Sequence, residues 1–160
     1  MWYILHETTR IIMNTSKHGV TGMALSSEEV QAFMDYLVDA TPTKAKVHKK
    51  GKEATDNSTR DAQVYFIEHE ATELYDILQK VAKMVNLYFK YDLSGIEKAQ
   101  IVHYKAPSNG YNYHIDIGAE GTAASRKVSV SIILNDEYEG GEICFRTSEE
   151  GTCQKPETGN

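Results

Sequence analysis

The chain has 160 residues, of which 41% are hydrophobic and 25% are charged, so it can form a core in one domain and is not a disordered polymer. Its formal net charge of -6 argues against nucleic acid as the main partner, because phosphate binding needs a clustered basic face. No apolar run reaches the length of a membrane span, so no membrane contact is expected. No secretory signal is recognisable, so a cytoplasmic location is expected, in which both cysteines would be reduced.

Two amphipathic helices are predicted in the first half of the sequence. Ser26 and Glu29 have the spacing of a capping box, and apolar residues at helical intervals follow as far as Ala40. A second, longer helix is predicted from the apolar spacing between Leu74 and Tyr88, and it should end near Tyr91.

Strands and loops are less sharply patterned in this half. A short strand is expected near Trp2–Leu5 or Ile11–Met13, and Gln63–Ile67 is predicted to be a further strand. The polar, lysine-rich stretch Thr43–Thr59 is expected to be an irregular, mobile loop, either simply solvated or contacting a substrate.

The hydrophobic period changes to two in the second half of the sequence. Four strands are predicted there: Ala99–Lys105, Tyr111–Ile117, Lys127–Leu134 and Glu142–Arg146. Helices followed by antiparallel strands indicate an α+β chain whose second half is a sandwich or barrel. The segment Gly151–Asn160 has the composition of turns, so the sheet is expected to be incomplete and the chain to stop within a domain.

One pair of residues in this half suggests metal chemistry. His114 and Asp116 are two positions apart on a predicted strand, so their side chains should share one face. An imidazole and a carboxylate side by side supply two of the three ligands of a 2-His-1-carboxylate site for non-haem Fe(II). The pattern His-x-Asp is short, and a hydrogen-bonded surface pair is the alternative interpretation.

The surroundings of this pair carry a family resemblance. In order, the stretch contains Tyr104, Gly110, Tyr111, His114 and Asp116, the strand-like Arg126–Asn135 and the turn Tyr138–Glu142. This series resembles the prolyl 4-hydroxylase-like (PKHD-type) branch of the 2-oxoglutarate- and Fe(II)-dependent dioxygenases, specifically over about 99–145 and loosely over 26–67. The resemblance implies one domain over 1–160: an incomplete double-stranded β-helix (jelly-roll) core over about 98–160, with C-terminal strands missing, supported by a helical part over about 23–95.

The resemblance also implies roles for four residues. His114 and Asp116 would be iron ligands, Tyr104 would lie near 2-oxoglutarate, and Tyr111 would lie beside the metal where the substrate arrives. Ordinary strand packing is the alternative for both tyrosines. The implied cofactor is Fe(II), with 2-oxoglutarate and O2 as co-substrates, ascorbate as reductant, and a prolyl or similar residue of a peptide or protein as substrate.

The chain departs from the family pattern after Asp116. The family has a second histidine ligand and then a basic residue that anchors 2-oxoglutarate, but no histidine follows Asp116, and Ile133 stands where some relatives have a tyrosine. The later basic residues are Arg126, Lys127, Arg146 and Lys155. The chain is therefore expected to end before the second ligand, with turnover absent or near background on its own.

Two other functions compete with the dioxygenase interpretation. A catalytically inactive jelly-roll module could bind a peptide or small ligand on its tyrosine-rich face. A zinc hydrolase could use Cys144 and Cys153, although their spacing does not suggest a zinc site.

Other residues of this half receive structural interpretations. Cys144 is expected to be a buried apolar residue, and Gly140 and Gly141 to serve a turn. His103 neighbours Tyr104 on a strand and should face the other way.

Overall fold

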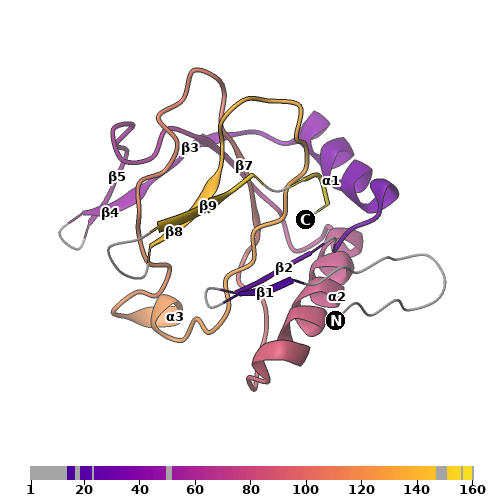
Figure 1. Cartoon of the computed structure of the whole chain (residues 1–160). Coiled ribbons are helices and arrows are strands. Elements are labelled where there is room, and N and C mark those ends of the chain that lie inside the picture. The colour runs from indigo at the N-terminus through magenta and orange to yellow at the C-terminus, as the bar shows by residue number, and fades with distance from the viewer. Residues whose placement is uncertain are drawn as a thin grey trace.

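The structure is a computed structural model that describes residues 14–16, 19–22, 24–49, 52–146, 151–155 and 157–159. It is a mixed α+β arrangement of helices and small antiparallel sheets (Figure 1). The strand considered near Trp2–Leu5 or Ile11–Met13 lies outside the described residues.

The described strands form four antiparallel sheets. The largest has the order β3-β6-β7, from β3 (Thr43–Lys44), β6 (Gln63–Phe66) and β7 (Gln100–His103). The others are the pairs β1 (Asn14–Ser16) with β2 (Gly19–Thr21), β4 (Val47–Lys49) with β5 (Lys52–Ala54), and β8 (Ile143–Arg146) with β9 (Gly151–Gln154).

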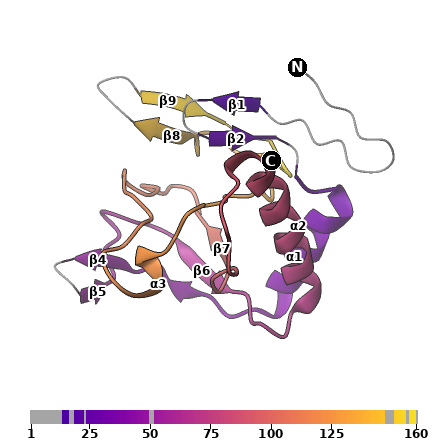
Figure 2. The same ribbon diagram turned by 90° about the horizontal axis from the view of Figure 1, so that it is seen from below.

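Both predicted helices are confirmed. Helix α1 (Ser27–Asp39) begins at the expected capping box, in which the Glu29 amide donates to Ser26 Oγ at 3.3 Å and the Ser26 amide donates to Glu29 Oε2 at 2.9 Å. Helix α2 (Thr72–Phe89) is followed by Lys90 in the left-handed conformation, with φ 57°. The two helices lie next to each other on one side of the molecule, and the short helix α3 (Gly121–Ala124) lies on the other (Figure 2).

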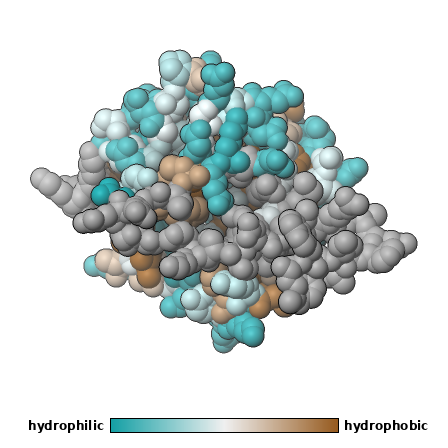
Figure 3. Space-filling model, viewed as in Figure 1, coloured by the Kyte–Doolittle hydropathy of each residue, from teal (hydrophilic) through white to brown (hydrophobic). Residues whose placement is uncertain are grey.

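The core is built between these helices and the largest sheet. Its buried apolar residues are Ala24, Leu25, Val30, Phe33, Ile67, Leu74, Ile77, Val81 and Ile101. Two tyrosines fix the end of β6 from the helices: the Tyr36 hydroxyl donates to the Phe66 carbonyl, and the Tyr75 hydroxyl donates to the Ile67 carbonyl. Hydrophilic residues cover much of the face in Figure 3, with hydrophobic patches between them.

The prediction of an irregular loop over Thr43–Thr59 is wrong. This stretch contains β3, β4 and β5, and Ala45 and Val47 are buried at 2% and 5% exposure. The lysines conceal a local alternation, since Ala45 and Val47 point inward while Lys44 and Lys46 remain exposed. Composition was therefore a poorer guide here than alternation.

The four strands predicted in the second half are only partly confirmed. Strands β7 and β8 form, but 111–117 and 127–134 are not strands, and Tyr111 makes only an isolated bridge with Arg60. Alternation specifies which face a residue takes and not which partner strand it finds. Ile132 and Leu134 still pack against the core cluster, so their alternation reports burial without a ladder.

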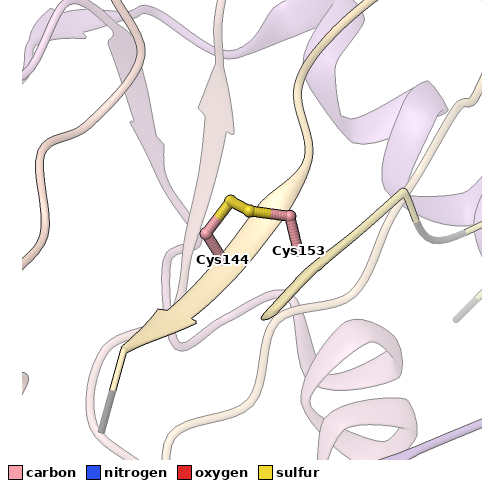
Figure 4. The surroundings of a disulfide bond; sticks show 2 residues. All are labelled: Cys144 and Cys153. Carbon is pink, nitrogen blue, oxygen red and sulfur yellow. A yellow bond between two sulfur atoms is a disulfide. The ribbon is translucent and has the colours of Figure 1, made fainter. Parts of the chain in front are cut away.

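The predictions for the end of the chain also need correction. Gly151–Gln154 is strand β9 and not a turn, and it places Cys153 directly opposite Cys144. The two form a disulfide, with their Cα atoms 4.0 Å apart, so Cys144 is not a free buried thiol (Figure 4). Beyond β9, the Gly159 carbonyl accepts from the amides of Ala24 and Leu25, which ties this segment to the start of α1.

The paired glycines follow a bend at Tyr138 and Glu139. Gly140 and Gly141 have φ 73° and 72°, values that residues with a Cβ rarely adopt. A Cβ on Gly141 would also lie 2.7 Å from the Tyr138 ring, so this position requires glycine twice over.

Candidate functional site

The candidate site is formed where the segment after β7 meets the segment before β6. The Asn112 amide donates to the Thr59 carbonyl at 3.0 Å, and the Asp61 amide donates to the Gly110 carbonyl at 2.9 Å. Ser108 Oγ donates to the Asp61 carbonyl at 2.8 Å, which adds a side-chain link. These bonds position the predicted site residues without a regular strand.

An aspartate-centred turn fixes the earlier of these two segments. The Asp56 carboxylate accepts from Ser58 Oγ at 2.6 Å and from Thr59 Oγ1 at 2.9 Å. The Asp56 carbonyl accepts from the amides of Thr59 and Arg60. This turn places Arg60 opposite Tyr111, with which it forms an isolated antiparallel β-bridge.

His114 and Asp116 lie against each other, as the spacing predicts. The distance from His114 Nε2 to Asp116 Oδ1 is 3.1 Å, and His114 Nδ1 lies 2.8 Å from the Asn112 carbonyl oxygen. A carbonyl oxygen can only accept, so Nδ1 carries a hydrogen. When Nε2 is not protonated, its lone pair faces the Asp116 carboxylate. The contact between Nε2 and Oδ1 is then favourable only with a proton or a cation between the two atoms.

The geometry of this pair fits a divalent metal ion. Two ligands that each meet a cation at about 2.1 Å and at a right angle lie about 3.0 Å apart. Metal-binding histidines commonly donate their other ring N–H to a carbonyl, as His114 does to Asn112. Within the described part of the chain no group of three potential His, Cys, Asp or Glu ligands is found. The His114 and Asp116 side chains are 38% and 49% exposed, so the site is open.

Both predicted tyrosines lie close to this pair or to its neighbour Arg60. The Tyr111 ring stacks on His114 with 3.7 Å between ring centroids, and Arg60 Cζ lies 4.7 Å from the centroid of the Tyr111 ring. Burial raises the pKa of Tyr104, and the nearby positive charge of Arg60 partly offsets this rise. Arg60 therefore lies near both tyrosines, and sequence reasoning missed it because it lies some fifty residues earlier.

A second arginine, Arg126, holds the backbone of Asp116 and pairs with Glu97. Arg126 Nη1 donates to the Asp116 carbonyl at 2.7 Å, while Nε and Nη2 donate to the Glu97 carboxylate at 2.8 and 2.7 Å. The hydrogen bond with Arg126 lowers the pKa of Glu97, and the same bond raises the pKa of Arg126. Arg126 is therefore a positioning residue for Asp116. No motif in the sequence pointed to this role.

Neither the other histidines nor the cysteines complete a group of three metal ligands among the described residues. His103 is exposed on β7, and His69 stacks on Tyr75 at 5.1 Å between ring centroids. Cys144 and Cys153 are joined to each other, so neither offers the thiolate that a zinc site would need. A surface hollow at the start of α1, which includes Ser27 and Glu73 in its lining, is separate from the site.

Comparisons with protein-family models, with curated proteins and with solved structures find no match for this chain. No helix in the described residues is both long and apolar enough to cross a membrane. Any functional interpretation therefore depends on the geometry of the site and on the motif resemblance.

Proposed function

We propose that His114 and Asp116 bind Fe(II), and that the chain is a 2-oxoglutarate-dependent dioxygenase acting on a prolyl or similar residue of a peptide or protein. The observation that supports this most is the 3.1 Å separation of His114 Nε2 and Asp116 Oδ1, with Nδ1 held by the Asn112 carbonyl. A ligand pair oriented by a backbone carbonyl is what a metal site requires.

Each residue has a part in this proposal. His114 and Asp116 hold the iron, which when bound supplies the oxygen chemistry. Tyr111, stacked on His114, limits the rotation of the imidazole and borders the approach of the substrate. Tyr104 orients the co-substrate through its hydroxyl. A double-stranded β-helix is part of the proposal, whereas the small antiparallel sheets of the described residues support the α+β class.

Metal binding is the primary test. Calorimetric titration with Mn(II), an oxidation-resistant substitute for Fe(II), is expected to show one site. His114→Ala and Asp116→Asn should each weaken it by about ten-fold or more, because each removes half of the ligand pair. His69→Ala is the matched control, since His69 is an exposed histidine that stacks on Tyr75 and not on a residue of the site. Equal Mn(II) affinity in wild type and His114→Ala would refute the proposal.

Turnover is a second, separate measurement. With two protein ligands the coordination is labile, so succinate formation from 2-oxoglutarate with Fe(II), ascorbate and O2 is expected to be near background. Robust succinate formation that His114→Ala abolishes would mean that a third ligand comes from outside the described residues or from another chain.

A binding module without catalysis is the second candidate function. The half-exposed ligand pair and the absence of a third ligand among the described residues favour it. Tyr104 and Tyr113, 42% and 59% exposed, would then contact a peptide directly. Proline-containing peptide that binds equally well with EDTA and with Mn(II) would favour this function over the dioxygenase.

A further inference from the structure

Arg60 is a partly buried cation without a carboxylate partner among the described residues. Its Nε atom is buried and has no hydrogen-bond partner in the described part of the chain. Arg126 shows the usual solution, since its guanidinium is paired with both oxygens of Glu97. Leaving a buried donor such as Nε without an acceptor is costly, and a guanidinium that has no carboxylate partner can receive an anionic ligand.

The surroundings of Arg60 provide a second donor. Arg60 lies close enough to Tyr104 for its positive charge to lower the pKa of the tyrosine against the effect of burial. The Tyr104 hydroxyl can donate its proton to a ligand. The Tyr111 ring lies over the guanidinium, with 4.7 Å between Arg60 Cζ and the ring centroid, and this cation–π contact helps to hold the guanidinium in place.

We infer that Arg60 and Tyr104 form a carboxylate-binding site beside the His114–Asp116 pair. The planar fork of an arginine matches the two oxygens of a carboxylate, and the Tyr104 hydroxyl adds a third donor. Two sources fit this chemistry: a small dicarboxylate, and an acidic side chain of a peptide. The identification of a dicarboxylate as 2-oxoglutarate rests on the proposed function, whereas carboxylate binding at Arg60 does not.

The test measures binding in EDTA, so that no metal contributes. The probes are 2-oxoglutarate and a blocked peptide with a glutamate beside a proline; the same peptide with glutamine is the uncharged control. One charged probe is expected to bind, with about ten-fold or greater loss in Arg60→Gln and a smaller loss in Tyr104→Phe. Arg146→Gln is the matched control, because Arg146 is exposed and lies 6.0 Å from the Tyr113 ring centroid.

The probe that binds identifies the source of the carboxylate. Failure of both charged probes to bind wild type, or equal affinity in Arg60→Gln, would overturn the inference. His114→Ala should keep carboxylate binding in EDTA while losing Mn(II). A wild type that binds the carboxylate probe but does not bind Mn(II) would refute the proposed function and leave this inference standing.

A measurement on the wild type covers the case in which Arg60→Gln does not fold. The Nε–H resonance of Arg60, assigned by its loss in Arg60→Lys, should move in nitrogen-15 NMR spectra when the binding probe is added. A resonance that stays in place at saturation would place the ligand elsewhere and overturn the inference.

Discussion

Two regions of the chain have equally clear sequence patterns but differ in how much of the expected structure forms. One is the helical region around α1, α2, β6 and β7, and the other is the site segment 104–142. The first forms nearly every expected element, while the second forms neither the strand over 111–117 nor the one over 127–134. A helix satisfies its backbone internally, but a strand needs a partner supplied by the rest of the fold. The site residues are accordingly held by loop hydrogen bonds and arginines, and not by a ladder.

The largest expected effect contrasts one isoleucine from each region. Ile67 is 1% exposed and Ile115 is 82% exposed. Ile67→Ala should lower the free energy of unfolding by about 2–5 kcal/mol, because it leaves a cavity in the core. Ile115→Ala should change it by less than about 0.5 kcal/mol. Urea denaturation compares the two, and similar losses would mean that the site segment is packed after all.

The disulfide should have the next largest effect. Cys144 and Cys153 are separated by 9 positions, and closing such a loop restricts the unfolded chain. Reduction, or replacement of both by serine, should lower the free energy of unfolding by about 2–3 kcal/mol. Urea curves with and without a reductant measure this, and the double serine variant should be insensitive to the reductant.

The support of the site by Arg126 is expected to act on metal affinity. Arg126→Gln removes the bond to the Asp116 carbonyl and should weaken Mn(II) binding by about 10–100-fold. Glu97→Gln leaves that bond but loosens the guanidinium, so a smaller loss is expected. Unchanged affinity in both variants would show that Asp116 is positioned without this pair.

The smallest effects concern the capping box of α1. Ser26→Ala should cost about 1 kcal/mol of stability. Burial raises the pKa of Glu29, but the hydrogen bonds from Lys80 and from the Ser26 amide outweigh it, so the pKa lies below the ordinary value of a glutamate. The ionised carboxylate therefore stabilises the fold above the ordinary pKa, and that contribution is lost as the pH falls through the lowered pKa. Glu29→Gln should flatten the acid side of the stability profile.

Sequence reasoning predicted the helices, β6, β7 and β8, because these elements depend on local spacing. His114 and Asp116 are in contact as expected, although the strand on which that prediction rested does not form. It could not predict Arg60 or Arg126, since each reaches the site through contacts distant in sequence. It also missed the bond between Cys144 and Cys153, which depends on the register of β8 with β9. Long-range pairing, rather than local pattern, is what escaped prediction.

The central claim is that a cation belongs between His114 Nε2 and Asp116 Oδ1. Nitrogen-15 NMR of the imidazole, with diamagnetic Zn(II) as a substitute for Fe(II), tests it most directly. We predict that Nδ1 carries a hydrogen throughout, and that Zn(II) moves the Nε2 resonance in wild type but not in Asp116→Asn at the same concentration. A His114 Nε2 resonance that stays unchanged up to saturating Zn(II) would contradict the account.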